Sequence, residues 1–130
     1  MKILIADDSA MIRRGVRGVL SSSSVYEVCG EADNGEDAIA KAKQLQPDLI
    51  LLDIRMPGAN GFQAAAAIRR EAPTTKIIIM SQHDEAHLLP RALEAGADAC
   101  IDKDSLGMEL LPTIRRLTET PGVPGAAKSD

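Results

Sequence analysis

Acidic, hydroxyl and amino side chains follow four short apolar runs of this 130-residue chain. Asp7 and Asp8 follow ILIA, Asp53 follows LILL, Ser81 follows IIIM, and Lys103 follows ACID. If these runs are strands of a parallel sheet, their carboxyl ends lie at one edge, where ligands bind in such folds. The pattern therefore predicts that five polar groups from four strands converge on one site.

Three neighbouring carboxylates repel one another, and at ~5 Å with an effective dielectric of ~20 each charged pair costs roughly 3 kcal/mol. Mg²⁺ is the natural partner, because it is a hard dication that prefers oxygen ligands. The first and third runs end in neither His nor Cys, which argues against zinc. A carboxylate beside Mg²⁺ can also act as a nucleophile toward a phosphoryl group, whose oxygens the metal, a lysine and a hydroxyl would hold.

Each residue also has a simpler interpretation when it is taken alone. Asp7 and Asp8 suit the start of a helix, where the helix dipole favours negative charge. Asp53 suits an Asx turn before a proline, and Ser81 suits a helix cap. Lys103 has an aspartate on either side, so it suits a surface ion pair. The combination of all five in one register favours the site.

The apolar runs are short and rich in Ile, Leu and Val, as strands buried on both faces are. They predict strands over Lys2–Ala6, Glu27–Ala32, Leu49–Asp53, Lys76–Met80 and Ala99–Asp102. Helical periodicity lies between them, after Ser9, after Asn34, after the Asn60–Gln63 capping box, within Glu85–Ala95, and from about Ser105 to Thr118. Five strand–helix repeats predict a doubly wound parallel α/β domain.

Two segments fit this pattern less well. Pro90 falls inside the fourth predicted helix and removes a backbone hydrogen bond, so we expect that helix to begin late or irregularly. The segment PGVPGAAKSD at residues 121–130 has no periodicity and is typical of a linker or frayed end. We therefore expect one domain over residues 1–119 and a flexible tail over residues 120–130.

Composition narrows the possible partners. The 15 basic and 19 acidic residues give a net charge of −4, which disfavours direct binding of nucleic acid by this domain. The apolar runs are too short to span a membrane, and no secretory signal is evident. The two cysteines, Cys29 and Cys100, do not suggest a disulfide scaffold. These features predict a soluble cytoplasmic domain without membrane contact.

The motifs together make the chain resemble the receiver domains of two-component response regulators. The resemblance covers roughly residues 2–118 and rests on IADDS, LLDIRMPGANG, IIIMSQHDE and CIDKDS. It implies a flavodoxin-like, CheY-like sheet of five parallel strands in the order 2-1-3-4-5, with five helices. It also implies a phosphorylation-controlled signalling switch, which assists its own phosphotransfer and dephosphorylation without being an enzyme acting on other substrates.

The resemblance assigns roles to the acidic residues one by one. Asp53 would accept the phosphoryl group, and its donor would be a phosphohistidine on a sensor histidine kinase. Asp8 and Asp53 would ligate Mg²⁺ directly, whereas Asp7 would act mostly through water. The backbone carbonyl of Arg55 would complete the protein ligands.

Ser81 and Lys103 would hold the phosphoryl oxygens, and His83, two residues beyond the serine, would tune dephosphorylation. The pair His83 and His87 matches a zinc-protease helix poorly, because aspartate follows the first histidine where that motif needs glutamate. Receivers usually carry an aromatic residue three positions before the lysine, where this chain has Cys100. We therefore expect switching to act through Ser81 with a muted response in the last strand.

The segments EVCGEADNGEDA, MPGANG, SQHDE and DKDS are similar to receivers of the NarL/FixJ class, which precede a LuxR-type helix-turn-helix. This likeness implies transcription regulation by a C-terminal DNA-binding output domain that is absent from the chain, with homodimerisation on phosphorylation. The alternative is a stand-alone or degenerate receiver that acts as a protein-interaction module. A dehalogenase-type phosphatase is disfavoured by Arg55, where its DxD motif needs a second acid, and an FMN carrier by the acids after the first strand.

Overall fold

Five parallel strands form one sheet in the order β2-β1-β3-β4-β5. They are β1 (Lys2–Ala6), β2 (Glu27–Ala32), β3 (Leu49–Asp53), β4 (Lys76–Ser81) and β5 (Ala99–Asp102). The computed structural model describes residues 1–82 and 85–119. The predicted order is confirmed, as are the bounds of four strands, while β4 runs one residue further than expected and includes Ser81.

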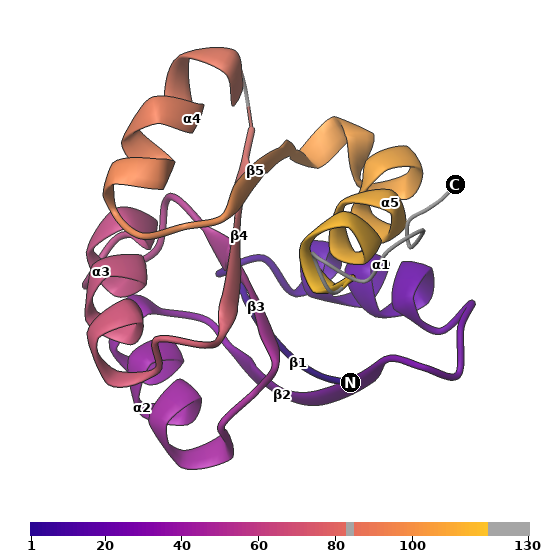
Figure 1. The fold of residues 1–130 in the computed structure, drawn as a ribbon, viewed down its shortest axis with the longest axis horizontal. Coiled ribbons are helices and arrows are strands. Elements are labelled where there is room, and N and C mark those ends of the chain that lie inside the picture. Colours follow the sequence, from indigo (N-terminus) through magenta and orange to yellow (C-terminus); the bar gives the residue numbers. More distant parts are fainter. Residues whose placement is uncertain (83–84, 120–130) are drawn as a thin grey trace.

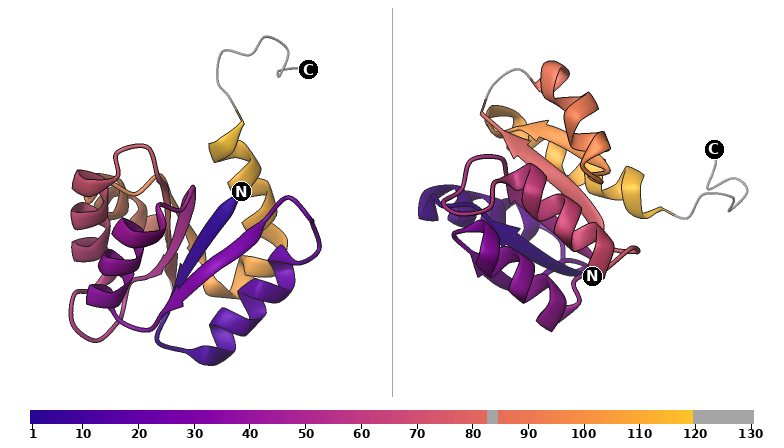
Figure 2. Two further views of the ribbon diagram at one scale, coloured as in Figure 1. Left: turned by 90° about the horizontal axis from the view of Figure 1, so that it is seen from below. Right: turned by 90° about the vertical axis from the view of Figure 1, so that its left-hand side faces the viewer.

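Helices cover both faces of this sheet (Figure 1). They are α1 (Ala10–Leu20), α2 (Gly35–Leu45), α3 (Gly61–Glu71), α4 (Glu85–Glu94) and α5 (Leu106–Thr118), and the 3₁₀ turn η1 (Lys103–Ser105) precedes α5. Helices α2, α3 and α4 lie on one face, and α1 and α5 lie on the other, as the views of Figure 2 also show. The predicted doubly wound α/β architecture is confirmed. The predicted tail at residues 120–130 lies outside the described residues.

The continuous apolar runs arise because each strand supplies side chains to two cores. In β1, Ile3 and Ile5 pack in the core beneath α1 and α5, whereas Leu4 and Ala6 pack in the core beneath α2, α3 and α4. All four side chains are fully buried. The same alternation recurs in β3 and β4, so the successive inner positions of the central strands all need apolar residues.

The predicted helix starts are confirmed by their caps. The Ser9 hydroxyl accepts the backbone N–H of Ile12 at 3.2 Å and begins α1. Asn34 caps α2, and Asn60 forms a reciprocal capping box with Gln63 at the start of α3. Each cap satisfies backbone donors that lack partners within the helix.

The expectation of a late start for the fourth helix is wrong, because α4 begins at Glu85 and includes Pro90. The alternative, an irregular start, stays a prediction, because residues 83–84 lie outside the described residues. A proline at this position removes a single backbone hydrogen bond. The fully buried Ala92 packs in the core and anchors the helix against the sheet despite this loss. The helix ends at Glu94, within the predicted range, and Gly96 follows two residues later with a φ of 104°, which is readily adopted only by glycine.

Cys29 on β2 and Cys100 on β5 lie at opposite edges of the sheet, as the family strand order implies. Within residues 1–82 and 85–119, none of the helices is long and apolar enough to cross a bilayer.

Arg69 on α3 joins several segments at the end of the sheet where the strands begin, opposite their carboxyl ends. Its guanidinium donates to the backbone carbonyls of Pro73, Thr75 and Gly96, and pairs with Asp98 at 2.8 Å. One side chain thus joins the end of α3, the start of β4 and the turn before β5.

Replacing Arg69 with methionine should lower the free energy of unfolding by about 2–3 kcal/mol, because several partly buried acceptors lose their donor at once. Urea denaturation followed by circular dichroism measures this loss. Arg70→Met is the matched control, because Arg70 is the next residue on α3 and is exposed. An equal effect of both substitutions would contradict the role of the Arg69 contacts.

Candidate metal and phosphoryl-acceptor site

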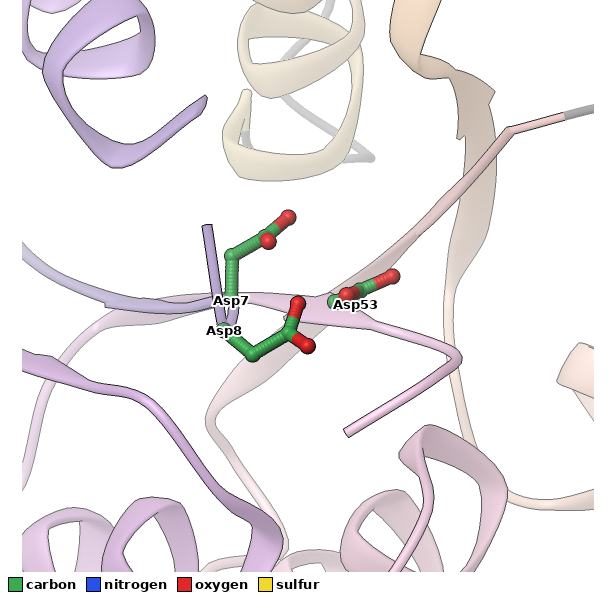
Figure 3. Close-up of side chains that lie close together, drawn as sticks. All are labelled: Asp7, Asp8 and Asp53. Atoms are coloured by element: carbon green, nitrogen blue, oxygen red, sulfur yellow. The ribbon is translucent and has the colours of Figure 1, made fainter. Parts of the chain in front are cut away.

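Three aspartates meet at the carboxyl edge of the sheet (Figure 3). Asp7 and Asp8 follow β1, and Asp53 ends β3, which pairs directly with β1. One carboxylate oxygen from each lies within 4.8 Å of the others. Asp7 is 0% exposed and Asp53 is 4% exposed, whereas Asp8 is exposed. The parallel register, with Ala6 opposite Leu52, brings the two strand ends level and therefore brings the acids together.

Lys103 is the cation of this cluster. Its Nζ lies 2.8 Å from Oδ2 of Asp7 and 3.0 Å from Oδ1 of Asp53. Its side chain is only 9% exposed, so the surface ion pair considered from the sequence is wrong. Asp102 positions the lysine by accepting the backbone N–H of Asp104 at 2.8 Å and capping η1.

The electrostatics of the cluster favour a further cation. Burial raises the pKa of the Asp53 carboxyl, and the negative charge of Asp7 raises it further, against the lowering effect of the Lys103 hydrogen bond. Burial alone would lower the pKa of Lys103, but its close pairing with the Asp7 and Asp53 carboxylates reverses the shift and raises it. With all four groups charged, three carboxylates and one ammonium carry a net charge of −2, which a dication would balance.

The oxygen atoms available in the cluster fit Mg²⁺. Oδ1 of Asp7 accepts the backbone N–H of Ser9 at 2.9 Å. Oδ2 of Asp7 is buried and lies at ion-pair distance from Lys103, but makes no hydrogen bond of regular geometry within the described residues. The three side chains offer only carboxylate oxygens, the ligands that a hard dication prefers. Asp7, Asp8 and Asp53 would hold the ion, whose chemistry would be to neutralise the oxygens of an incoming phosphoryl group.

A cavity of about 820 Å³ lies beside Asp53, and other residues that the sequence assigned to the site also line it. Asp8, Arg55, Ser81 and Lys103 all line it. The backbone N–H of Arg55 donates to Oδ1 of Asp53 at 3.3 Å. Ser81 is 2% exposed and is the last residue of β4. The roles of these residues in catalysis and metal binding stay predictions.

The cavity is also lined by residues that the sequence did not predict. They lie in the loop after β3, on α3, just after β4 and on α4: Met56, Asn60, Phe62, Gln82, Leu88 and Arg91. The guanidinium of Arg91 stacks 4.7 Å from the centre of the Phe62 ring. The sequence offers a weak signal here, because Phe62 is one of only two aromatic residues in the chain.

Two predicted tuning residues have different outcomes. Cys100 is half-buried on β5, and its thiol donates to the Ser81 hydroxyl at 3.9 Å, so the cysteine touches the predicted phosphoryl-binding residue. His83 lies outside the described residues.

Comparisons with known proteins agree with this geometry. Residues 3–115 match the family described as the response regulator receiver domain. The chain belongs to the response regulator receiver family. The resemblance inferred from the motifs, including the likeness to regulators of the NarL/LuxR type, is confirmed.

Among curated proteins, the receiver is 39% identical to the Bacillus subtilis transcriptional regulatory protein YxjL over 88% of the chain and 53% of that protein. It is 37% identical to the Staphylococcus aureus response regulator VraR, over 89% of the chain and 56% of VraR. The chain thus spans about half the length of the curated relatives that it matches.

Solved structures show the same fold. The receiver domain of a NarL-type regulator from Mycobacterium tuberculosis is 40% identical, with a TM-score of 0.81 over 88% of this chain and 93% of that one. The response regulator domain of Thermotoga maritima CheB is 32% identical, with a TM-score of 0.83 over 93% of this chain and 98% of that one.

The raised pKa of Asp53 predicts how the receiver responds to pH without metal. A carboxyl whose pKa is higher in the folded state favours folding while it is protonated, and this advantage is lost as pH rises through the folded pKa. In a metal-free buffer, Asp53→Asn should therefore raise the melting temperature at pH 7 and have little effect near pH 3. Thermal denaturation at both pH values measures it, and stabilisation confined to acid pH would contradict the burial of a costly charge.

Proposed function

We propose that this receiver accepts a phosphoryl group on Asp53 from a sensor histidine kinase in a Mg²⁺-dependent reaction. The observation that carries the proposal is the cluster in which the buried Asp53 lies beside Asp7, Asp8 and Lys103. Asp53 opens onto a cavity that a phosphoryl group can enter. Membership of the receiver family supports the same chemistry.

Each residue of the site has its own role in the proposed reaction. Asp53 supplies the attacking carboxylate oxygen, and its hydrogen bond from the Arg55 N–H keeps one oxygen in a fixed orientation. Asp8, Asp53 and the Arg55 carbonyl would hold Mg²⁺ directly, and Asp7 would hold it through water. Lys103, which pairs with Asp53 in this structure, moves its ammonium onto a phosphoryl oxygen, and Ser81 donates to another.

The partners follow from the relatives. YxjL is described as a transcriptional regulatory protein. A solved structure of a LuxR-family protein from Staphylococcus aureus, 28% identical to this chain, is described as a DNA-binding response regulator. We propose that the chain is the phosphorylated half of such a regulator, working in the cytoplasm, with residues 120–130 linking it to a DNA-binding output domain. Phosphorylation would then promote homodimerisation. The receiver itself binds no nucleic acid and acts on no other substrate in this proposal.

The phosphoacceptor is tested by mass spectrometry after incubation with Mg²⁺ and a small phosphodonor such as acetyl phosphate. The wild-type protein should gain the mass of one phosphoryl group, and chelation of Mg²⁺ should abolish the gain. Asp53→Asn should remove it, because the amide is a poor nucleophile.

Asp104→Asn is the control for this experiment, because Asp104 is exposed and adjoins Lys103 in sequence. It should be phosphorylated as the wild-type protein is. A wild-type protein that gains no phosphoryl group would favour a degenerate receiver, which acts as an interaction module without phosphorylation.

Cys100 carries a separate prediction about how phosphorylation is reported. Its side chain is smaller than the usual aromatic residue, and its thiol contacts Ser81. A phosphoryl mimic such as beryllofluoride should therefore shift the amide resonances near Ser81 strongly and those of β5 and α5 weakly. Cys100→Tyr should enlarge the β5 and α5 response. A large response in the wild-type protein that the substitution leaves unchanged would refute the muted switch.

A further inference from the structure

The loop at residues 54–60 joins β3 to α3, and the backbone at its two ends is in direct contact, with no side chain between. The N–H of Gly61 donates to the carbonyl of Ile54 at 2.8 Å. A Cβ atom on Gly61 would lie 2.4 Å from the backbone oxygen of Asp53, which is far inside van der Waals contact. The two ends of the loop therefore touch directly beneath Asp53.

The middle of the loop rests on the first turn of α2. The N–H of Gly35 donates to the carbonyl of Pro57 at 3.2 Å, and a Cβ atom on Gly35 would lie 1.9 Å from the carbonyl oxygen of Ala59. The Glu36 carboxylate accepts the N–H of Ala59 at 3.0 Å. Gly58, with a φ of 78°, leaves room for the Glu36 carboxylate, because a Cβ atom on residue 58 would lie 1.8 Å from Oε1 of Glu36.

We propose that Glu36 is a positioning residue for the metal and phosphoryl site. Between the two anchors of the loop lies Arg55, whose N–H donates to Oδ1 of Asp53. Its carbonyl is the third protein ligand of Mg²⁺ under the proposed function, on which this inference rests. By holding Ala59, the Glu36 carboxylate fixes where the loop lies, and hence where both backbone groups of Arg55 point.

The first turn of α2 is suited to this role because it is itself fixed. Asn34 caps the helix by accepting the N–H of Asp37, and the adjacent Gly35 is buried. A carboxylate in the first turn is also favoured by the helix dipole. Glu36 itself is exposed, so its removal takes no apolar packing from the core. The substitution therefore tests the loop rather than the fold.

Three variants separate the hydrogen bond from the charge. Glu36→Ala removes both, whereas Glu36→Gln keeps an amide oxygen that can accept from Ala59. Asp37→Ala is the matched control, because Asp37 also lies in the first turn of α2 but pairs with Lys41 at 2.9 Å instead of the loop.

Mg²⁺ affinity measured by calorimetry is the first readout, and amide hydrogen exchange of Ala59 is the second. Glu36→Ala should weaken Mg²⁺ binding by about two- to tenfold, the range set by one ordinary hydrogen bond. It should also speed exchange at Ala59. Glu36→Gln and Asp37→Ala should stay within about twofold of wild type in both measurements.

The outcomes distinguish this inference from the proposed function. If Glu36→Ala speeds exchange at Ala59 but binds Mg²⁺ like Asp37→Ala, the loop is tethered without positioning the site, and the inference is overturned. Unchanged exchange at Ala59 would overturn it as well. A wild-type protein that binds no Mg²⁺ at all would instead overturn the proposed function on which it rests.

Discussion

Burial of like charge at the carboxyl edge of the sheet is the constraint on which the rest of the site depends. Asp7 and Asp53 are almost completely buried, with oxygen atoms close to each other and to those of Asp8. Such an arrangement persists only if opposite charge lies nearby, and Lys103 supplies one positive charge from β5. The remaining excess of negative charge favours a dication, which under the proposed function would in turn neutralise the oxygens of an incoming phosphoryl group.

The same constraint explains how a binding event at the edge can be transmitted. Lys103 is shared between Asp7 and Asp53, so any new anion on Asp53 competes for it. Ser81 and Lys103 stand at the ends of neighbouring strands, β4 and β5, and Ser81 contacts the Cys100 thiol. Under the proposed function, movement of Ser81 would reach β5 through the Cys100 side chain, which is much smaller than the aromatic residue common in the family.

The two ends of the parallel strands differ in how their polar groups affect stability. Where the strands begin, the half-buried guanidinium of Arg69 donates to several carbonyls and one carboxylate, an arrangement that contributes to stability. At the other end, charges are held at a cost, and the loop after β3 is supported from outside by α2. Because the contacts of these two regions do not overlap, substitutions at Arg69 and at Glu36 should act independently.

Much of this receiver was already determined by its sequence. The apolar runs and the residues Ser9, Asn34 and Asn60 predicted the strands and helix starts, because strand burial and capping are local rules. The acids, serine and lysine at the strand ends predicted the site, because parallel strands end at one edge. The tertiary structure decided which pairs form. Three sets of contacts depend on how helices and loops far apart in sequence pack together. They are the pairing of Lys103 with Asp7 and Asp53, the stacking of Arg91 on Phe62, and the hydrogen bond from Ala59 to Glu36. No local pattern encodes those distances, because they follow from the packing of the whole domain.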